Sequence, residues 1–466
     1  MTAQGKQGMG RGTFLLASIA CLVLLQLCFV ASNVGANMLP KAALQERAEA
    51  SWASPLLTNI YRYDTSIATI PVCYDNNRFI IEVAQQRSWD DPLTTSVRAS
   101  IADRSPEGVD VPFDYFRYWH GWQMLCDLGL LAGGIGAIQA IVLTLLAVSI
   151  IWLTVALSAS VGLPAAITFS AAAFIPTGLG ITFMTDLTLG ISLSAGIFTS
   201  ALLVTVGHLK RQDEPYSTRR LLSLIALGGG AVYCFLDFLT IPAAVLAMVV
   251  FCGAIACRRQ GSTIRWHLST IACITIAFGV GFLATWMFKW VLAAIVIGPE
   301  YVVGNVIGEM SIWTSEHGEL PRPHWASWLK SLYSLSPQLF ALLAPLGYMT
   351  LNSPLLAATI LAAVALLVYE LATSRKGRRA MGNHARPMQA ISWKELFTLA
   401  IPMAYIPLYT LAMSSHAIVH IPVFSSRIWS VFFAIALCLL VWRLAPSSRG
   451  RAAAVSSIRR DTVGQS

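Results

Sequence analysis

The residues with the clearest capacity for chemistry lie in one short stretch, 111–123. It reads V-P-F-D-Y-F-R-Y-W-H-G-W-Q and sets Asp114, Arg117 and His120 among aromatic side chains. The stretch comes just before a long apolar run, where a polar loop would meet a membrane, and aromatic rings with a polar edge are typical of that depth. Two interpretations follow: an aromatic belt whose charges face water, or one wall of a binding site at the membrane surface.

Composition indicates the class of protein to which this stretch belongs. The chain has 466 residues, of which 56% are hydrophobic and only 12% are charged, whereas roughly 25% of residues are charged in soluble domains. Several apolar runs are long enough, at about 18 residues or more, to cross a bilayer as helices. The sequence therefore predicts an all-α fold, a polytopic transmembrane bundle of about ten spans, or eleven, with a large exterior loop after the first span.

The net charge of +9 does not indicate nucleic-acid binding. Lys and Arg gather in short loops between apolar runs, as at 208–220 and 258–265, which is the pattern of cytoplasmic loops in membrane proteins. We therefore expect a multi-pass protein of the inner (plasma) membrane with both termini in the cytoplasm, contact with membrane lipid and no nucleic-acid partner. The sequence leaves the oligomeric state open.

The same rule divides the chain into segments. They are a cytoplasmic N-terminus with the first span (1–34), an exterior loop (35–126), spans two to seven (127–297), a second exterior loop (298–334), spans eight to ten (335–443) and a cytoplasmic tail (444–466). Within them we expect span two as one helix over 128–157. The basic run 375–386 belongs inside, so we read 336–348 as shallow or re-entrant and 355–371 as span eight.

Few residues indicate a metal or a disulfide. Of nine cysteines, only Cys73 and Cys126 lie in or beside the large polar segment, and they could pair if that segment faces an oxidising compartment. There is no C-x-x-C or His-rich signature, so we predict no metal site and leave the cofactor unknown, with a divalent metal still open. His416 and His420 would share a helix face; they fit a phosphate bound together with Arg427, a metal, or a plain exterior turn.

The predicted topology places ionisable residues from distant parts of the chain on the outer side. Asp237, at the tip of an apolar hairpin, is either a solvated cap or a charge at the rim of a site, since a carboxylate there is costly unless solvated or paired. Lys289, inside span seven, either extends to the surface or faces a lipid phosphate. The candidate residues are Asp75, Arg117, His120, Asp237, Lys289, His416, His420 and Arg427.

Three motifs resemble those of a poorly characterised group of bacterial polytopic membrane proteins. They are F-R-Y-W-H-G-W before span two, F-L-D-F-L-T at a hairpin, and S-S-H-A-I-V-H…S-R before the last span. That group often has R-Y-W-H-G-Y, F-D-F-L-T and N-H-S-Y-I-H…Y-R at these places. Its plan is similar to that of membrane-embedded glycosyltransferases of the GT-C architecture, which use a polyprenyl-phosphate sugar as donor.

The resemblance implies a catalytic carboxylate in the first exterior loop, where the best match is Asp75. Many members carry a paired acidic motif there, whereas this chain has a single Asp and its Asp-Asp pair, Asp90-Asp91, comes later. The group's Asn-His is Ser-His here, so only His416 carries over. The implied chemistry is proton abstraction from an acceptor hydroxyl by Asp75, with cationic side chains stabilising the phosphate that leaves.

Two other function classes fit the same sequence. A transporter or flippase of a lipid-linked or small substrate would need a polar path through the bilayer, and few charged residues are available to line one. A non-catalytic membrane protein is favoured by the single carboxylate near position 75. The discriminating observation is whether Asp75, His120 and His416 meet in one cavity.

Overall fold

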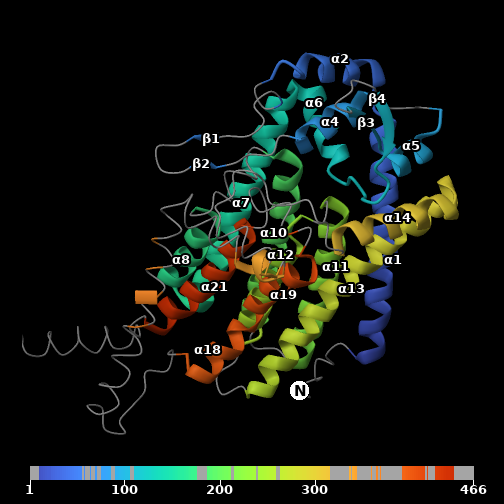
Figure 1. Cartoon of the computed structure of the whole chain (residues 1–466). Helices are drawn as coiled ribbons and strands as arrows, with labels where there is room; N and C mark the ends of the chain where they lie inside the picture. Colours follow the sequence, from blue (N-terminus) through green and yellow to red (C-terminus); the bar gives the residue numbers. More distant parts are fainter. Residues whose placement is uncertain are drawn as a thin grey trace, which may run out of the picture.

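The chain folds into a bundle of long helices with a smaller group of elements at one end (Figure 1). The computed structural model describes residues 10–54, 57, 63–64, 69–70, 75–85, 90–104, 110–175, 186–210, 215–237, 240–258, 263–314, 335–336, 338–343, 358, 361, 364–365, 368, 391–414, 417 and 426–444. The predicted span eight and the basic run that follows it therefore lie largely outside the described residues.

Within the described residues, six helices are long and apolar enough to cross a membrane, so the chain is a helical membrane protein. They are α1 (Arg11–Asn37), α7 (Ile135–Val161), α10 (Leu187–Leu209), α11 (Pro215–Leu236), α13 (Ile264–Ile297) and the run Trp393–Ala412, which consists of α18 (Trp393–Ala400), the 3-10 turn η1 (Ile401–Ala404) and α19 (Tyr405–Ala412). Large apolar side chains on α1 and α13, such as Leu24, Ile276 and Leu283, are exposed, as expected for surfaces in contact with lipid.

Shorter helices complete the bundle and its end. They are α2 (Lys41–Ser51), α4 (Asp75–Gln85), α5 (Pro92–Arg98), α6 (Gln123–Gly133), α8 (Leu163–Phe174), α12 (Pro242–Ala256), α14 (Pro299–Thr314) and α21 (Ser426–Leu444). Apart from the eighth, every predicted span overlaps one of these helices or of the six long ones. The all-α prediction is thus confirmed for the bundle.

The predicted second span is broken. Helices α6 and α7 meet at Gly134, whose φ of 72° lies in the left-handed region, so 128–157 is not one helix. The mean hydropathy over a long window does not reveal this break, because the residues of α6 and of α7 are both apolar on average.

The segment between α1 and α6 contains short strands that the sequence did not predict. Strands β1 (Tyr63–Asp64) and β2 (Thr69–Ile70) pair antiparallel, and so do β3 (Ser100–Arg104) and β4 (Asp110–Asp114). The second pair, in which Ser100 lies opposite Asp114, returns the chain from α5 to the aromatic stretch. Figure 1 shows α2, α4, α5 and α6 with this pair at the end of the bundle where α10 begins.

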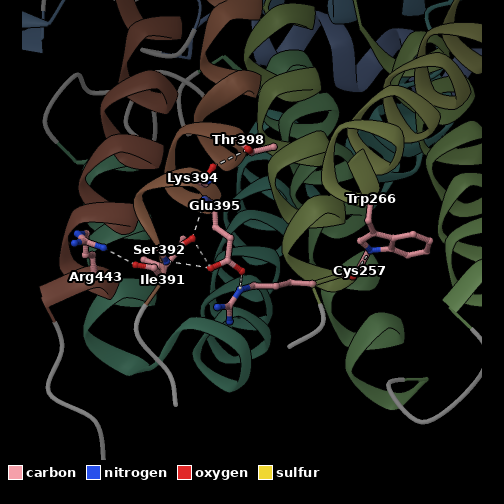
Figure 2. A network of polar contacts seen from close by, with 9 residues as sticks. Cys257, Trp266, Ile391, Ser392, Lys394, Glu395, Thr398 and Arg443 are labelled. Carbon is pink, nitrogen blue, oxygen red and sulfur yellow. Dashed lines mark hydrogen bonds and ion pairs between the residues drawn. The ribbon is translucent and has the colours of Figure 1, made fainter. Parts of the chain in front are cut away.

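The other end of the bundle is basic, and a network of polar contacts ties its helix ends together (Figure 2). Glu395 closes a capping box with Ser392 at the start of α18 and forms an ion pair with Arg258 at 3.4 Å. Arg443 donates to the Ile391 carbonyl at 2.5 Å and lies over the Trp393 ring. We call this the basic end; the ends of α12 and α21 and the start of α18 meet there, so these helices share one boundary.

Candidate functional site

Much of the stretch 115–122, which follows β4, is buried. Phe116, Trp119, His120 and Trp122 are each at most 2% exposed. The interpretation as an aromatic belt facing water therefore does not apply to these four side chains; it stays open for the half-buried Arg117. The buried side chains of the stretch pack instead between α1, α11 and α13, where they connect the exterior segment to the bundle.

Trp119 is the centre of these contacts. Its indole N–H donates to the carbonyl oxygen of Thr285 on α13 at 2.9 Å, and its own carbonyl oxygen accepts from the Asn33 amide on α1. The indole stacks on Phe288 with centroids 6.0 Å apart. One residue of the stretch is thus fixed by both helices, which is what sets the position of its neighbours Tyr118 and His120.

A polar face of α1 meets this stretch. Gln26, Asn33 and Asn37 are buried, and their spacing of seven and four residues puts them on one side of the helix. Gln26 donates to the Thr285 hydroxyl at 2.8 Å, and Asn37 donates to the Ser96 hydroxyl of α5 at 2.6 Å. These three amides are not among the predicted site residues, although amides at helical spacing in an otherwise apolar first span are a visible signal.

Lys289 is buried, with 1% of its surface exposed, and its ammonium group faces the end of α5. It donates to the carbonyl oxygens of Val97 at 3.0 Å and Ser96 at 3.4 Å. It also lies 5.4 Å from the centroid of the Trp119 ring, within cation–π range. The last carbonyls of a helix have no partner inside it, so Lys289 serves as a C-terminal cap for α5.

His120 has an unusual backbone conformation, with φ of 55°. Its Nε2 is 2.9 Å from the Tyr115 carbonyl oxygen. Burial lowers the pKa of the imidazole to about 3; the hydrogen bond with Tyr115 opposes this shift and the nearby charge of Lys289 adds to it. At neutral pH the ring is therefore uncharged, so it can exchange a hydrogen bond but brings no positive charge to a phosphate.

This shift predicts a loss of stability in acid. A buried histidine with a depressed pKa takes up its proton more readily in the unfolded chain, so stability falls as pH drops below the unfolded pKa of about 6.5. Between pH 7 and pH 5 the free energy of unfolding should fall by about 2 kcal/mol. Chemical unfolding of the purified protein at both pH values measures this. His120→Asn, which tolerates the left-handed conformation, should remove most of the difference; an unchanged pH slope would contradict the assignment.

Gly121 joins the aromatic stretch to the hairpin that carries Asp237. Its N–H donates to the Phe235 carbonyl oxygen at 2.9 Å, and a Cβ at position 121 would lie 2.3 Å from the Phe235 ring. Only glycine fits so close an approach. The R-Y-W-H-G-W and F-L-D-F-L-T motifs, far apart in sequence, are thus neighbours in the fold.

Asp237 is a buried cap rather than a solvated one, with 4% of its surface exposed. Its carboxylate accepts from the Thr240 backbone N–H at 3.0 Å and from the Ser192 hydroxyl of α10 at 3.4 Å. The hydroxyls of Tyr233 and Tyr409 lie close enough to interact with its charge. The carboxylate therefore ties the hairpin after α11 to α10.

Asp75 is the first residue of α4, and a neighbouring residue ties that helix to α10. The Asn77 side-chain oxygen accepts from the Leu187 N–H at 2.9 Å. Leu187 follows Asp186, the buried N-cap of α10. The start of α4 is therefore held at the end of α10 that also leads to Ser192 and Asp237.

Arg117 sits at the margin of these contacts and is half-buried. Its guanidinium donates to the Asn305 side-chain oxygen of α14 at 3.1 Å and lies 5.3 Å from the centroid of the Tyr115 ring. Of the predicted residues, Arg117, His120, Lys289 and Asp237 thus gather around residues 115–121.

Other predicted residues have no described side chain. His416, His420 and Cys73 lie outside the described residues, and Arg427 is placed only as a backbone position in the first turn of α21. Cys126 is buried in α6, so its predicted pairing with Cys73 remains a prediction. In the part of the chain that is described, no group of three His, Cys, Asp or Glu side chains could hold a metal ion.

Comparison with protein-family models, with curated proteins and with solved structures gives no match to this chain.

Proposed function

We propose that the protein is an integral-membrane glycosyltransferase of the plasma membrane. It moves a sugar from a polyprenyl-phosphate donor to an acceptor on the outer face, and both termini are cytoplasmic. The observation that carries the proposal is the hydrogen bond between Asn77 and Leu187. It ties the start of α4, where Asp75 lies, to the end of the bundle that holds Asp237.

The distribution of charge supports the orientation. Arg219, Arg258 and Arg443 lie at the basic end, where Arg219 donates to Ser269 and Arg258 pairs with Glu395. Basic residues favour the cytoplasmic side. The exterior segment with α4 and α5 is at the opposite end of the bundle (Figure 1), which corresponds to the outer face.

The proposed reaction assigns the base to Asp75. The carboxylate takes the proton of an acceptor hydroxyl, the hydroxyl oxygen bonds to the anomeric carbon of the sugar, and the bond from that carbon to the phosphate oxygen breaks. The phosphate leaves with the electron pair. Its charge needs cationic donors, for which Arg117 and Arg427 are the candidates, with His416 as a further donor. His120, Lys289 and Asp237 are positioning residues in this proposal.

A second candidate function is transport of a lipid-linked or small substrate. It is favoured by the burial of Asp237 and Lys289 near the end of the bundle, because ionisable residues within membrane helices often mark a substrate or ion path. Transport and transfer leave different products, so one experiment separates them.

The test compares lipid-linked sugars and surface glycans in cells with and without the protein. If the proposal holds, loss of the protein raises the polyprenyl-phosphate sugar and removes a glycan. Asp75→Asn, present at the normal protein level, should reproduce the loss of the glycan. Its rate of sugar transfer should be lower than that of the unchanged protein by roughly a hundredfold or more. The matched control is Asp90→Asn, which removes an exposed carboxylate of the same segment. Normal profiles with Asp75→Asn would refute the assignment, and an unprocessed glycan retained on the inner leaflet would favour transport.

A further inference from the structure

A cavity of about 210 Å³ lies in the exterior segment, between α4, α5 and the first turn of α6. It is lined by Val83, Asp91, Thr94, Thr95, Arg98, Ala99 and Gln123. Since a water molecule occupies about 30 Å³ in the liquid, this is room for a ligand of roughly seven water volumes. Sites for drug-sized molecules are larger, at about 300–1,000 Å³. The cavity is therefore of the size that suits one small ring.

The inner side of α5 is held by buried polar contacts. At seven residues the helix is too short to be stable alone. Ser96 accepts from Asn37 and donates to the Asn33 carbonyl at 2.9 Å, while Lys289 caps the carbonyl end. Burial of a polar group costs free energy unless the group is hydrogen-bonded. The hydrogen bonds of these buried groups hold α5 in place. Such support is expected beneath a binding surface.

The outer side of α5 faces the cavity. Asp91, Thr94, Thr95 and Arg98 project from it, and Ala99, which follows, has φ of 45°. Ala99 is the left-handed C-cap of α5, and its N–H donates to the Thr95 carbonyl oxygen at 3.0 Å, so the helix ends in a defined geometry beside the cavity. The short helix thus presents a charged and hydroxylated wall whose geometry is set from behind.

The wall carries charges of both signs. Hydrogen bonds from Thr94 hold the pKa of Asp91 below its usual value, so the carboxylate is ionised. The guanidinium of Arg98 carries the opposite charge, so a simple anion or cation would meet one attractive and one repulsive group, and the two charges of the wall sum to zero. The polar lining therefore favours a ligand without net charge.

The donors and acceptors on the wall suit hydroxyl groups. Thr95 donates its own hydroxyl hydrogen to the Asp91 carbonyl at 2.8 Å, which leaves its oxygen as an acceptor. Arg98 has only donors, and the Gln123 amide has both. Each hydroxyl of a sugar donates and accepts, so a sugar ring can form hydrogen bonds with these groups, while Val83 and Ala99 meet its C–H surface. Charge-assisted bonds of this kind are the stronger ones.

We propose that this cavity is a saccharide site that binds one neutral sugar ring. That the cavity binds a sugar does not depend on the proposed function. That this sugar belongs to the acceptor of the transferase does rest on it. Val83 is eight residues beyond Asp75 on α4, about 12 Å along the helix at 1.5 Å per residue. The ring in the cavity is then not the reacting one but a remote sugar of an acceptor with two or more rings.

The test is saturation-transfer NMR on the full chain in nanodiscs, with empty nanodiscs as background. The probes are the methyl glycosides of glucose, galactose, mannose and N-acetylglucosamine, with β-alanine as a zwitterion; ³¹P line broadening of inorganic phosphate tests the anion. We expect transfer to at least one glycoside. Phosphate could also bind at the donor site of the proposed transferase, so for phosphate and β-alanine we expect that any signal is unchanged by substitutions in the cavity wall. Asp91→Asn retains an N-cap residue but removes the charge, and Arg98→Gln removes the donor fork. Each should weaken binding of that glycoside by about tenfold. Arg47→Gln on α2, also exposed, is the matched control and should leave it unchanged.

Two results would overturn the saccharide assignment. One is the absence of transfer to every glycoside, or binding of β-alanine or phosphate that Asp91→Asn or Arg98→Gln weakens, which would place an ion in the cavity. The other is glycoside binding that neither Asp91→Asn nor Arg98→Gln weakens, which would place the sugar elsewhere. Because the assay needs no turnover, it separates the two proposals. If Asp75→Asn leaves the glycan profile normal while the cavity binds a sugar, only the transferase proposal is refuted. If Asp75→Asn removes the glycan while the cavity binds no sugar, only the saccharide site is refuted.

Discussion

Replacing Gly281 with alanine is expected to lower the free energy of unfolding by about 3 kcal/mol, the upper part of the range for overpacked interiors. Gly281 on α13 is buried against α11, and a Cβ there would lie 1.9 Å from the Leu227 carbonyl oxygen. The contact is reciprocal, because a Cβ at Gly230 of α11 would lie 2.1 Å from the Phe278 carbonyl oxygen. Carbon-to-oxygen contacts between helices are normally about 3.3 Å or longer.

The two helices must therefore move apart by more than about 1 Å to admit one methyl group. Both obstacles are backbone atoms, which cannot turn away as a flexible side chain can. Since α11 and α13 pack along much of their length, the displacement would loosen many contacts at once. It would also shift Thr285 and Lys289, which lie one and two turns further along α13 and contact Gln26 and α5.

Gly279 supplies the matched control on the same helix. A Cβ at Gly279 would meet nothing within 4 Å, so Gly279→Ala should stabilise the helix by about 0.5–1 kcal/mol through propensity alone. Thermal and denaturant unfolding of both variants in detergent measures the difference. Equal stabilities would show that α11 and α13 do not approach as closely as described.

Replacing Lys289 with methionine is the second large change, with an expected loss of about 2 kcal/mol. Methionine preserves most of the side-chain volume but removes the ammonium donor. The Ser96 and Val97 carbonyl oxygens would then be buried without it, at about 1–3 kcal/mol for each group left unsatisfied. The methionine side chain is neutral, so its burial avoids the cost of desolvating the lysine charge. The net loss of unfolding free energy is therefore smaller than the sum of the costs for the two carbonyl oxygens.

The location of the effect distinguishes a cap from a general core residue. Hydrogen exchange in Pro92–Arg98 should accelerate more than in the bundle, because the lost bonds end α5 specifically. Sugar binding in the adjacent cavity should weaken as well. Lys394→Met, at an exposed position near the basic end, is the control and should change stability by about 0.5 kcal/mol or less. Exchange in α5 that is unchanged while the whole protein loses stability would refute the capping role.

The sequence by itself determined the class of the protein and much of its plan. Apolar runs predicted helices, and each predicted span except the eighth, which is not described, overlaps one. Basic residues near Arg258 and Arg443 predicted that these two parts of the chain lie on the same side of the membrane. In the structure Arg258 pairs with Glu395 and Arg443 donates to the Ile391 carbonyl oxygen, so both parts contact the start of α18. These features depend on composition within a window of neighbouring residues, which can be read without knowing the fold.

Only the tertiary structure decided the role of the polar residues. The bond from Asn33 to Trp119 joins positions 86 apart, and the cap from Lys289 to Ser96 joins positions 193 apart. Hydropathy cannot show that these groups meet, so the sequence left Lys289 facing the surface or a phosphate and Asp237 exposed or at a rim. Burial depends on which helices pack together, and that depends on contacts such as Gly281 with Leu227, which have no signal in a local window. The same reason hides the cavity at α5, whose walls come from three helices and exist only after those helices have packed.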